Sequence, residues 1–376
     1  MKQYNKQSRF CHPVLWSLIL GLTLISGCFD TEDIDRRMIV SPIGIDADSG
    51  GKMLVTFRMP LVNQARQQQG NQTDQKNFIL RSASAQGLFP ALIDIQNRDV
   101  NTIFVGQCRT VIFGEDLAKR GLKPALDFFT RMPTFPPSAF IAIARPTALE
   151  LLKIDWPQQE TNGQNIRWFF SNRANQIFGV KQWELFRNIF DPLQDPLVPI
   201  ITLSDENTTI KLLGMAVFQG ERMVGELDRD ETTLFGMLRY VKKENRLVIP
   251  IDRSVPITFQ VATGKKKLKV SYPGHPLFKL DLKVNAFIGE LGGYQSPLSK
   301  RELRQLEIKS SRHLERKYLE LFRKLQALQS DPLDLGNHFR IQQPKHFLLT
   351  KWPQEYRRSE FQVRVKVFIE RLGVLQ

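Results

Sequence analysis

The chain has few cysteines and histidines, and it lacks the short motifs that mark common catalytic and cofactor sites. Its 376 residues include three cysteines and five histidines, and no two histidines stand at a metal-binding helical spacing. The HExxH, CxxC and GxSxG patterns are absent, as are the glycine-rich dinucleotide and phosphate loops. The sequence therefore predicts no catalytic residue, no metal and no cofactor, and it argues against an enzyme.

Long apolar runs are also missing, because none reaches the roughly 20 residues that a membrane-spanning helix needs. The run from Val14 to Ile25 follows a short positive segment, and its 12 residues suit the apolar core of a signal peptide. It ends in Ile25-Ser26-Gly27-Cys28, which resembles a bacterial lipobox. We predict a lipoprotein signal peptide at 1–27 and a diacylglyceryl group on Cys28. An ordinary signal peptide followed by a chance cysteine is the alternative.

The remaining cysteines cannot form an internal disulfide in the mature chain. Cys11 would leave with the signal peptide and Cys28 would carry lipid, so Cys108 has no partner. Cys108 lies within the apolar, strand-like stretch "NTIFVGQCRTVIFG". This setting predicts a buried structural thiol and not a reactive one.

Acidic residues are scarce relative to basic ones. The chain has 53 Lys and Arg against 38 Asp and Glu, and the signal peptide holds three of the former and none of the latter. The mature chain therefore carries 50 − 38 = +12, a surplus that suggests anionic lipid or an acidic partner. The stretch "GKKKLK" at 264–269 could face such a partner, or it could be a solvated hairpin tip. Export argues against nucleic acid as the partner.

The patterns of apolar residues alternate between helical and strand periods. The first part of the mature chain, 28–200, reads as an α/β domain in which Gly50-Gly51 turns a hairpin, Ser84 to Gln96 forms a helix and 63–77 forms a loop. Three prolines in "DPLQDPLVPI" suggest a boundary near residue 200. The second part, 201–376, reads as an α+β domain, with a split into 205–245 and 246–376 as the alternative.

The second part has the clearest signals. A hairpin turns at Gly220, and alternation dominates over 246–290, which predicts an antiparallel sheet with one wet face. A helix runs from Ser299 to about Gln329. Ser299 and Glu302 form a capping box at its start. Alternation over 361–369 predicts a last strand inside the fold. The fold class is α/β mixed (α+β) and multidomain, with mixed and antiparallel sheets flanked by helices and a long helix near the C-terminus.

The long helix presents both an apolar stripe and a charged face. Leu321 belongs to the stripe, which we expect to pack on the sheet. Arg312, Arg316 and Arg323 belong to the charged face, which could dock on membrane or partners. A merely solvated helix face is the alternative.

Several stretches, in order, resemble one known family. They are "GCFDTEDIDRRMIVSPIGID", "FVGQCRTVIFGEDLAKRGLKPALDFFTR", "GMAVFQGERMVGEL", "SDPLDLGNHF" and "WPQEYRRSEFQVRVKVFIERLG". Together they resemble the C-subunit lipoproteins of spore germinant receptors, the Ger(x)C family of endospore-forming bacteria. Two features depart from the family pattern: Phe29 stands where Trp is usual, and "LDLGNHF" replaces a more glycine-rich turn.

The resemblance implies both a place and a role for the chain. It implies a three-part α/β body anchored by lipid at the outer face of the inner spore membrane or cell membrane, working with A and B type membrane-spanning subunits. The implied role is assembly and signalling in nutrient-triggered germination after sporulation, without a catalysed reaction. A solute-binding lipoprotein of a transport system would share the signal and the size. The long antiparallel stretch at 246–290 argues against that alternative.

Overall fold

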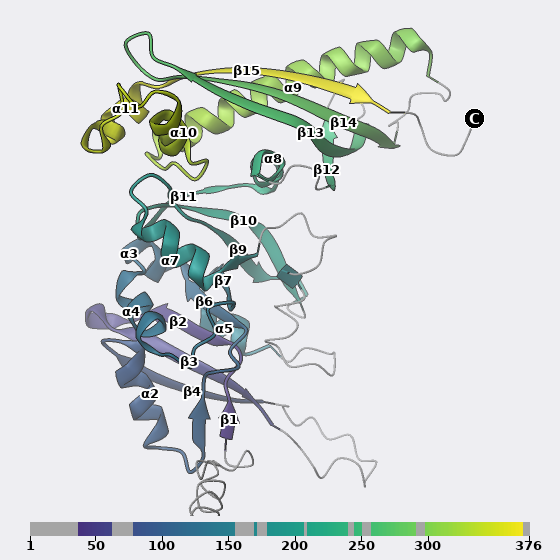
Figure 1. Ribbon diagram of the computed structural model, residues 1–376. Helices are drawn as coiled ribbons and strands as arrows, with labels where there is room; N and C mark the ends of the chain where they lie inside the picture. The colour runs from purple at the N-terminus through teal and green to yellow at the C-terminus, as the bar shows by residue number, and fades with distance from the viewer. Residues whose placement is uncertain are drawn as a thin grey trace, which may run out of the picture.

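The computed structural model describes residues 37–61, 78–154, 169–170, 179–206, 209–239, 244–249, 257–290 and 298–370. These residues form an elongated molecule with two bodies (Figure 1). The N-terminal body, described within residues 37–227, is built on a nine-stranded sheet, and the C-terminal body, described within residues 229–370, on a four-stranded sheet.

The nine-stranded sheet has parallel strands at its centre and antiparallel hairpins at both ends. Its order is β11-β10-β9-β7-β6-β2-β3-β4, with β8 paired to β7, and β2, β6, β7 and β9 run parallel. The strands are β2 (Ile43–Ala47), β3 (Met53–Pro60), β4 (Phe78–Ala85), β6 (Thr110–Gly114), β7 (Phe140–Ala144), β8 (Val180–Lys181), β9 (Leu197–Leu203), β10 (Ile210–Gln219) and β11 (Arg222–Leu227). A short separate sheet pairs β1 (Arg37–Ile39) with β5 (Thr102–Phe104).

Helices cover both faces of the central strands, which explains why these strands are continuously apolar. Val111 and Phe113 of β6 pack in the larger core, while Ile112 between them packs in the smaller core on the other face. Figure 1 shows α2, α3, α4 and α7 on one side of the sheet and α5 on the other. The helices are α2 (Leu88–Gln96), α3 (Glu115–Arg120), α4 (Lys123–Arg131), α5 (Ala148–Leu152) and α7 (Gln182–Phe190).

The C-terminal body packs one face of its sheet on helices. The sheet order is β12-β13-β14-β15, antiparallel except for the parallel pair β14–β15. Leu280, Leu282 and Val284 share one core with α8, α9, β10 and β11, so the two bodies are joined by apolar packing. The elements are α8 (Arg229–Arg239), β12 (Glu244–Ile249), β13 (Ile257–Ser271), β14 (Leu277–Glu290), α9 (Lys300–Ala327), α10 (Leu335–Gln342), η4 (Leu349–Lys351), α11 (Trp352–Arg358) and β15 (Glu360–Ile369).

Most sequence predictions of elements are confirmed. The fold is mixed α+β, α9 begins at the predicted capping box of Ser299 and Glu302, and the hairpin β10–β11 turns at Gly220, whose φ is 56°. The predicted loop at 63–77 lies outside the described residues.

One element boundary is wrong. Ser84 and Ala85 belong to strand β4 and not to the following helix, because they continue its pairing with β3. The predicted last strand is confirmed as β15, which places Val365 and Val367 in the core. It forms an edge of its sheet, and α9 supplies the hydrogen-bond partners that a second neighbouring strand would have supplied.

The predicted domain boundary stays a prediction. Residues 200 and 201 lie within β9, and β10 and β11 extend the same sheet.

Candidate functional site

The lipid attachment site predicted at Cys28 lies outside the described residues, so it stays a prediction. Cys108 is described and is fully buried, as predicted. Its thiol lies 3.2 Å from the carbonyl oxygen of Thr110, to which it donates. Burial raises the pKa of this thiol to about 12. Cys108 is therefore protonated at physiological pH and is a structural residue of the core.

Two kinds of site are not found in the described part of the chain. No group of three or more His, Cys, Asp or Glu side chains there could hold a metal ion. Among the same residues, no helix combines the length and the apolar character that crossing a bilayer requires.

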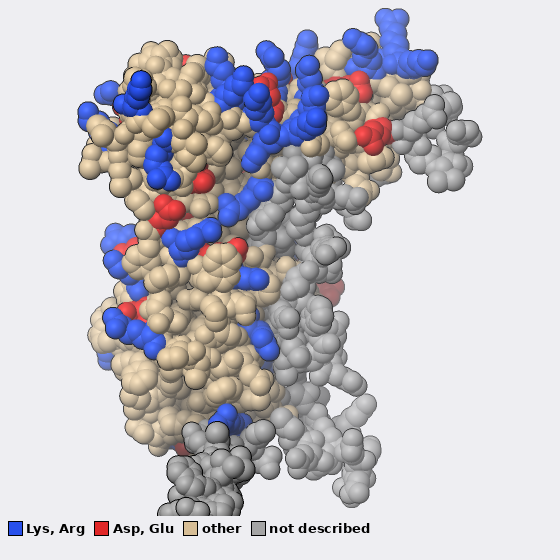
Figure 2. All heavy atoms as spheres, viewed as in Figure 1, with Lys and Arg blue, Asp and Glu red and all other residues tan. Residues whose placement is uncertain are grey.

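The most distinctive surface is the outer face of the four-stranded sheet, where cationic side chains of three strands lie together. We call this set the basic face. It consists of Lys265, Lys267 and Lys269 on β13, Lys279 and Lys283 on β14, and Arg364 and Lys366 on β15. All seven side chains are exposed, and Figure 2 shows Lys and Arg gathered over the C-terminal body.

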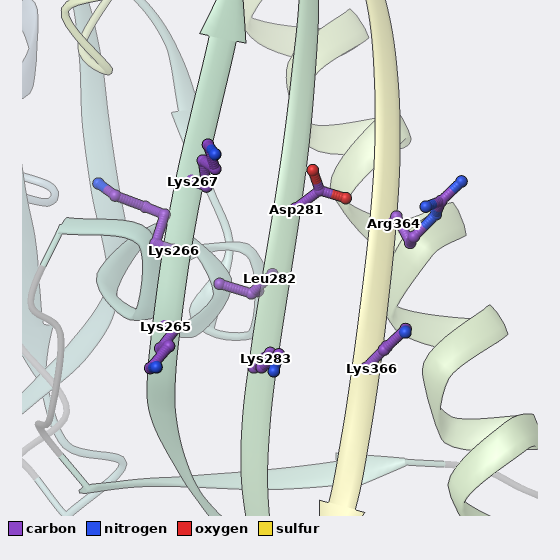
Figure 3. A pocket seen from close by; sticks show the side chains of 8 residues that line it. All are labelled: Lys265, Lys266, Lys267, Asp281, Leu282, Lys283, Arg364 and Lys366. Carbon is purple, nitrogen blue, oxygen red and sulfur yellow. The ribbon is translucent and has the colours of Figure 1, made fainter.

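Strand register brings these cations side by side. Lys265 is paired with Lys283, which is paired in turn with Lys366. In the same way Lys269 is paired with Lys279. Because side chains alternate across a strand, all of them point to the face opposite the apolar core. Figure 3 shows five of the seven around a depression of about 530 Å³.

Two acidic side chains point to the same face of the sheet. Asp281 stands between Lys267 and Arg364 in the register, and Glu360, at the start of β15, lies 3.0 Å from His275. Within the residues that the structure describes, none of the seven cations forms an ion pair at 4 Å or less. Like charges directly opposite one another on a sheet are destabilising. The arrangement is thus unfavourable for the isolated sheet and favourable for binding an anionic group.

Two exposed aromatic side chains extend the same face. Phe287 of β14 and Phe368 of β15 are 44% and 43% exposed. The Lys283 ammonium lies 6.0 Å from the centre of the Phe368 ring, where the cations of the basic face meet the two aromatic side chains. The surface is therefore polarised along the strands, basic in one part and aromatic in the next.

Lys266 differs from its neighbours because it points to the other side of the sheet. Its ammonium donates to the carbonyl oxygen of Leu238 at the end of α8, at 2.6 Å. Burial lowers its pKa. This side chain links the sheet to α8 and is not part of the basic face.

The outer face of α9 is basic as well, but its charges are more balanced. Arg312, Arg316 and Arg323 are exposed, as predicted. Arg316 lies 3.7 Å from Glu320, which also pairs with Lys317 at 3.2 Å. The helix thus neutralises part of its own charge, which the basic face does not.

The sequence identified only part of this surface. The stretch at 264–269 is not a hairpin tip: it lies inside β13, and the turn comes at Tyr272–Pro276, where Gly274 has a φ of 107°. The sequence did not predict that the cations of β14 and β15 lie beside the lysines of β13 on one face. The available signal was the regular charge alternation in "FKLDLKV" and "QVRVKV".

Comparisons with known proteins cover both bodies. The family model "Spore germination protein N-terminal domain" matches residues 30–203, and "Spore germination B3/GerAC like, C-terminal" matches residues 213–373. The spore germination protein GerQC of Bacillus cereus is 23% identical over 364 residues, 96% of this chain and 98% of its own. The putative spore germination protein YfkR of Bacillus subtilis (strain 168) is 24% identical over 376 residues, 95% of this chain and 96% of its own.

One solved structure is similar in fold. The crystal structure of the GerBC protein matches with a TM-score of 0.53 and 21% sequence identity, over 88% of this chain and 97% of the GerBC chain. The likeness of fold therefore extends across the N-terminal and C-terminal bodies together.

Proposed function

Because the chain belongs to the C-subunit family of spore germinant receptors, we propose that it is a lipoprotein subunit of a nutrient germinant receptor. It acts in spore germination by assembling with membrane-spanning subunits and signalling with them. The observation that carries this proposal is the pair of family matches, which together span nearly all of the chain after the predicted signal peptide.

The described surfaces support action by contact. Cations without acidic partners lie on the basic face, and further arginines lie on the outer face of α9. Such surfaces suit electrostatic recognition of another macromolecule. The solute-binding alternative is weaker, because the described strands form one nine-stranded sheet, one four-stranded sheet and the short β1–β5 pair, and not two similar doubly wound lobes.

The proposed anchor is a diacylglyceryl group on Cys28, which would hold the chain at the outer face of the inner spore membrane or cell membrane. Two acyl chains give firm attachment where one is marginal. The nine residue steps from Cys28 to Arg37, the first described residue, span at most about 31 Å. The N-terminal end of the molecule would therefore stay close to the membrane.

The test compares Cys28→Ala with wild type in sporulating cells. Cys28→Ala should lose incorporated fatty-acid label, move to the soluble fraction and slow the germination response to nutrient. Cys108→Ala is the matched control, because it removes the other cysteine of the mature chain and should keep the label. A wild-type protein without label, or spores whose response to nutrient does not depend on this chain, would contradict the proposal.

A further inference from the structure

The structure places seven exposed cations on one sheet face, opposite the apolar core. The apolar side chains of the same strands, such as Leu280 and Val284, supply the core contacts from the opposite face. Lys265 lies directly opposite Lys283, and Lys269 directly opposite Lys279, so the two positive charges within each pair repel each other. An array of cations that costs stability, and in which none of the seven forms an ion pair with a described residue, is suited to an anionic partner.

We propose that the basic face is a docking site for an acidic polypeptide segment of a partner protein. The spacing of the cations fits such a segment: alternate residues of a strand lie about 6.8 Å apart, so Lys265, Lys267 and Lys269 match acidic residues at alternate positions of an extended chain. Phe287 and Phe368 lie on the same face beyond the cations. They would contact apolar residues that follow the acidic residues in the partner segment. The segment is thus acidic over one part and apolar over the next.

The placement of the basic face favours a protein over the bilayer, and this step rests on the anchor of the proposed function. Figure 1 shows β1, the element nearest the anchor in sequence, at the opposite end of the molecule from the four-stranded sheet. The seven strand spacings from β4 to β11 alone measure about 34 Å, and α8 and the four-stranded sheet lie beyond them. Since the inner face of that sheet packs toward β10 and β11, the basic face points away from the anchored end.

Binding is tested first with defined probes on the full lipoprotein in a neutral detergent. The labelled peptide (Glu-Ser)₆ should bind about tenfold or more tightly than (Gln-Ser)₆, and raised salt should weaken its binding. The variant Lys265→Glu, Lys283→Glu, Lys366→Glu should lose at least about tenfold in affinity. The control variant Lys52→Glu, Arg109→Glu, Arg222→Glu makes the same change in net charge at exposed sites of the N-terminal body, and it should lose less than about threefold.

Three results of this assay overturn the proposal. One is equal binding of the two peptides, and another is equal loss in the two triple variants. The third is failure to bind either peptide while vesicles containing phosphatidylglycerol bind through the basic face. That result would assign the basic face to lipid instead.

The second test uses a photo-crosslinking residue in place of Gln362, an exposed neutral position paired with Lys279. In spore membranes the cross-linked peptide should come from another polypeptide and contain a cluster of acidic residues. The cross-link should disappear in the basic-face variant and persist in the control variant. Cross-links to lipid, to a second copy of this chain or to segments without acidic clusters overturn the proposal, as does the absence of any cross-link that depends on the basic face.

The two proposals can fail separately. Cys28→Ala reports on the anchored receptor subunit whether or not the basic face binds peptide. Cys28→Ala spores could show the expected germination defect while the basic-face variant germinates and cross-links like wild type. That combination of results would support the proposed function and rule out the docking site.

Discussion

Asp195 and Asp331 join the two bodies through a reciprocal pair of hydrogen bonds. The backbone N–H of Asp331 donates to the Oδ2 atom of Asp195 at 2.8 Å, and the backbone N–H of Asp195 donates to the carbonyl oxygen of Asp331 at 3.1 Å. The Oδ1 atom of Asp195 also accepts from Gly220 N–H at the β10–β11 turn. Burial raises the pKa of both carboxyl groups. The stretch before β9 and the stretch after α9 thus form one buried polar network.

The first prediction concerns the pH dependence of this network. Burial, with a smaller contribution from the nearby Asp195 charge, raises the pKa of Asp331 from 3.8 to about 8, although Leu335 and Gly336 N–H donate to its carboxyl group. The folded chain therefore holds this proton more tightly than the unfolded chain. The stability contributed by Asp331 is fully present below about pH 4 and is lost as pH rises through about 8.

Urea unfolding at pH 5 and pH 8.5 measures this effect. Asp331→Asn should lower the free energy of unfolding at pH 5 by about 1–3 kcal/mol, because an amide group replaces one accepting oxygen. Between pH 5 and 8.5, wild type should lose about 1 kcal/mol or more relative to the variant. The exposed Asp205→Asn is the control and should follow wild type. Parallel pH profiles of wild type and Asp331→Asn would contradict the prediction.

The second prediction concerns the edge of the four-stranded sheet. β15 has an unpaired side, and three α9 side chains accept its outward N–H groups: Glu315 from Val365 at 2.9 Å, Ser311 from Val367 at 3.0 Å and Glu307 from Ile369 at 3.0 Å. These side chains follow one another at intervals of four, so they lie on one helix face. They protect an edge that would otherwise be open to pairing with another chain.

Removing one of these acceptors should weaken the C-terminal body. Glu315→Ala should lower the free energy of unfolding by about 1–3 kcal/mol, because it leaves the Val365 donor unpaired. Glu315→Gln keeps an accepting oxygen and should recover most of the loss. Glu320→Ala, on the exposed side of the same helix, should cost less than about 0.5 kcal/mol. Equal stability of the two alanine variants in urea titrations would show that the edge contact contributes nothing.

The third prediction concerns the thiol of Cys108. It is fully buried and its pKa is raised to about 12, so a soluble thiol reagent at pH 8 should not modify it in a chain that starts near Thr31. One thiol should react after addition of urea. The same chain should unfold cooperatively at the same urea concentration with and without reductant, because no disulfide can form within it. Rapid reaction of the thiol without denaturant would disprove its structural role.

Local patterns in the sequence predicted most elements, and contacts between distant segments account for the failures. The capping box at Ser299 and the alternation in β14 each depend on residues that lie close together in the sequence, so both could be predicted from it. The end of β4 could not, because Ala85 is held by pairing with Met53 of another strand. The local strength of a helical pattern does not reveal where a neighbouring strand stops.

The same distinction applies to the candidate site. The run of lysines at 264–269 was visible, but its meaning depends on Lys283 and Lys366, which only strand register brings beside it. The contact of Asp195 with Asp331 joins residues 136 positions apart and has no local signature. Composition predicted a basic protein with an anionic partner, and tertiary structure was needed to place the surface.

The last prediction separates the two faces of α9. Leu321 is 1% exposed and packs in the core shared with β10, β14 and β15, so Leu321→Ala should lower the free energy of unfolding by about 2–5 kcal/mol. Arg312, Arg316 and Arg323 point to solvent, and changing all three to Glu should cost within about 0.5 kcal/mol each. If this face docks on membrane subunits, the charge-reversed protein should be present at normal level in spores but recover less of its membrane partners and slow germination. Leu321→Ala should instead lower the protein level itself. Normal partner recovery and germination in the charge-reversed spores would show that this helix face is only solvated, and docking would then depend on other surfaces.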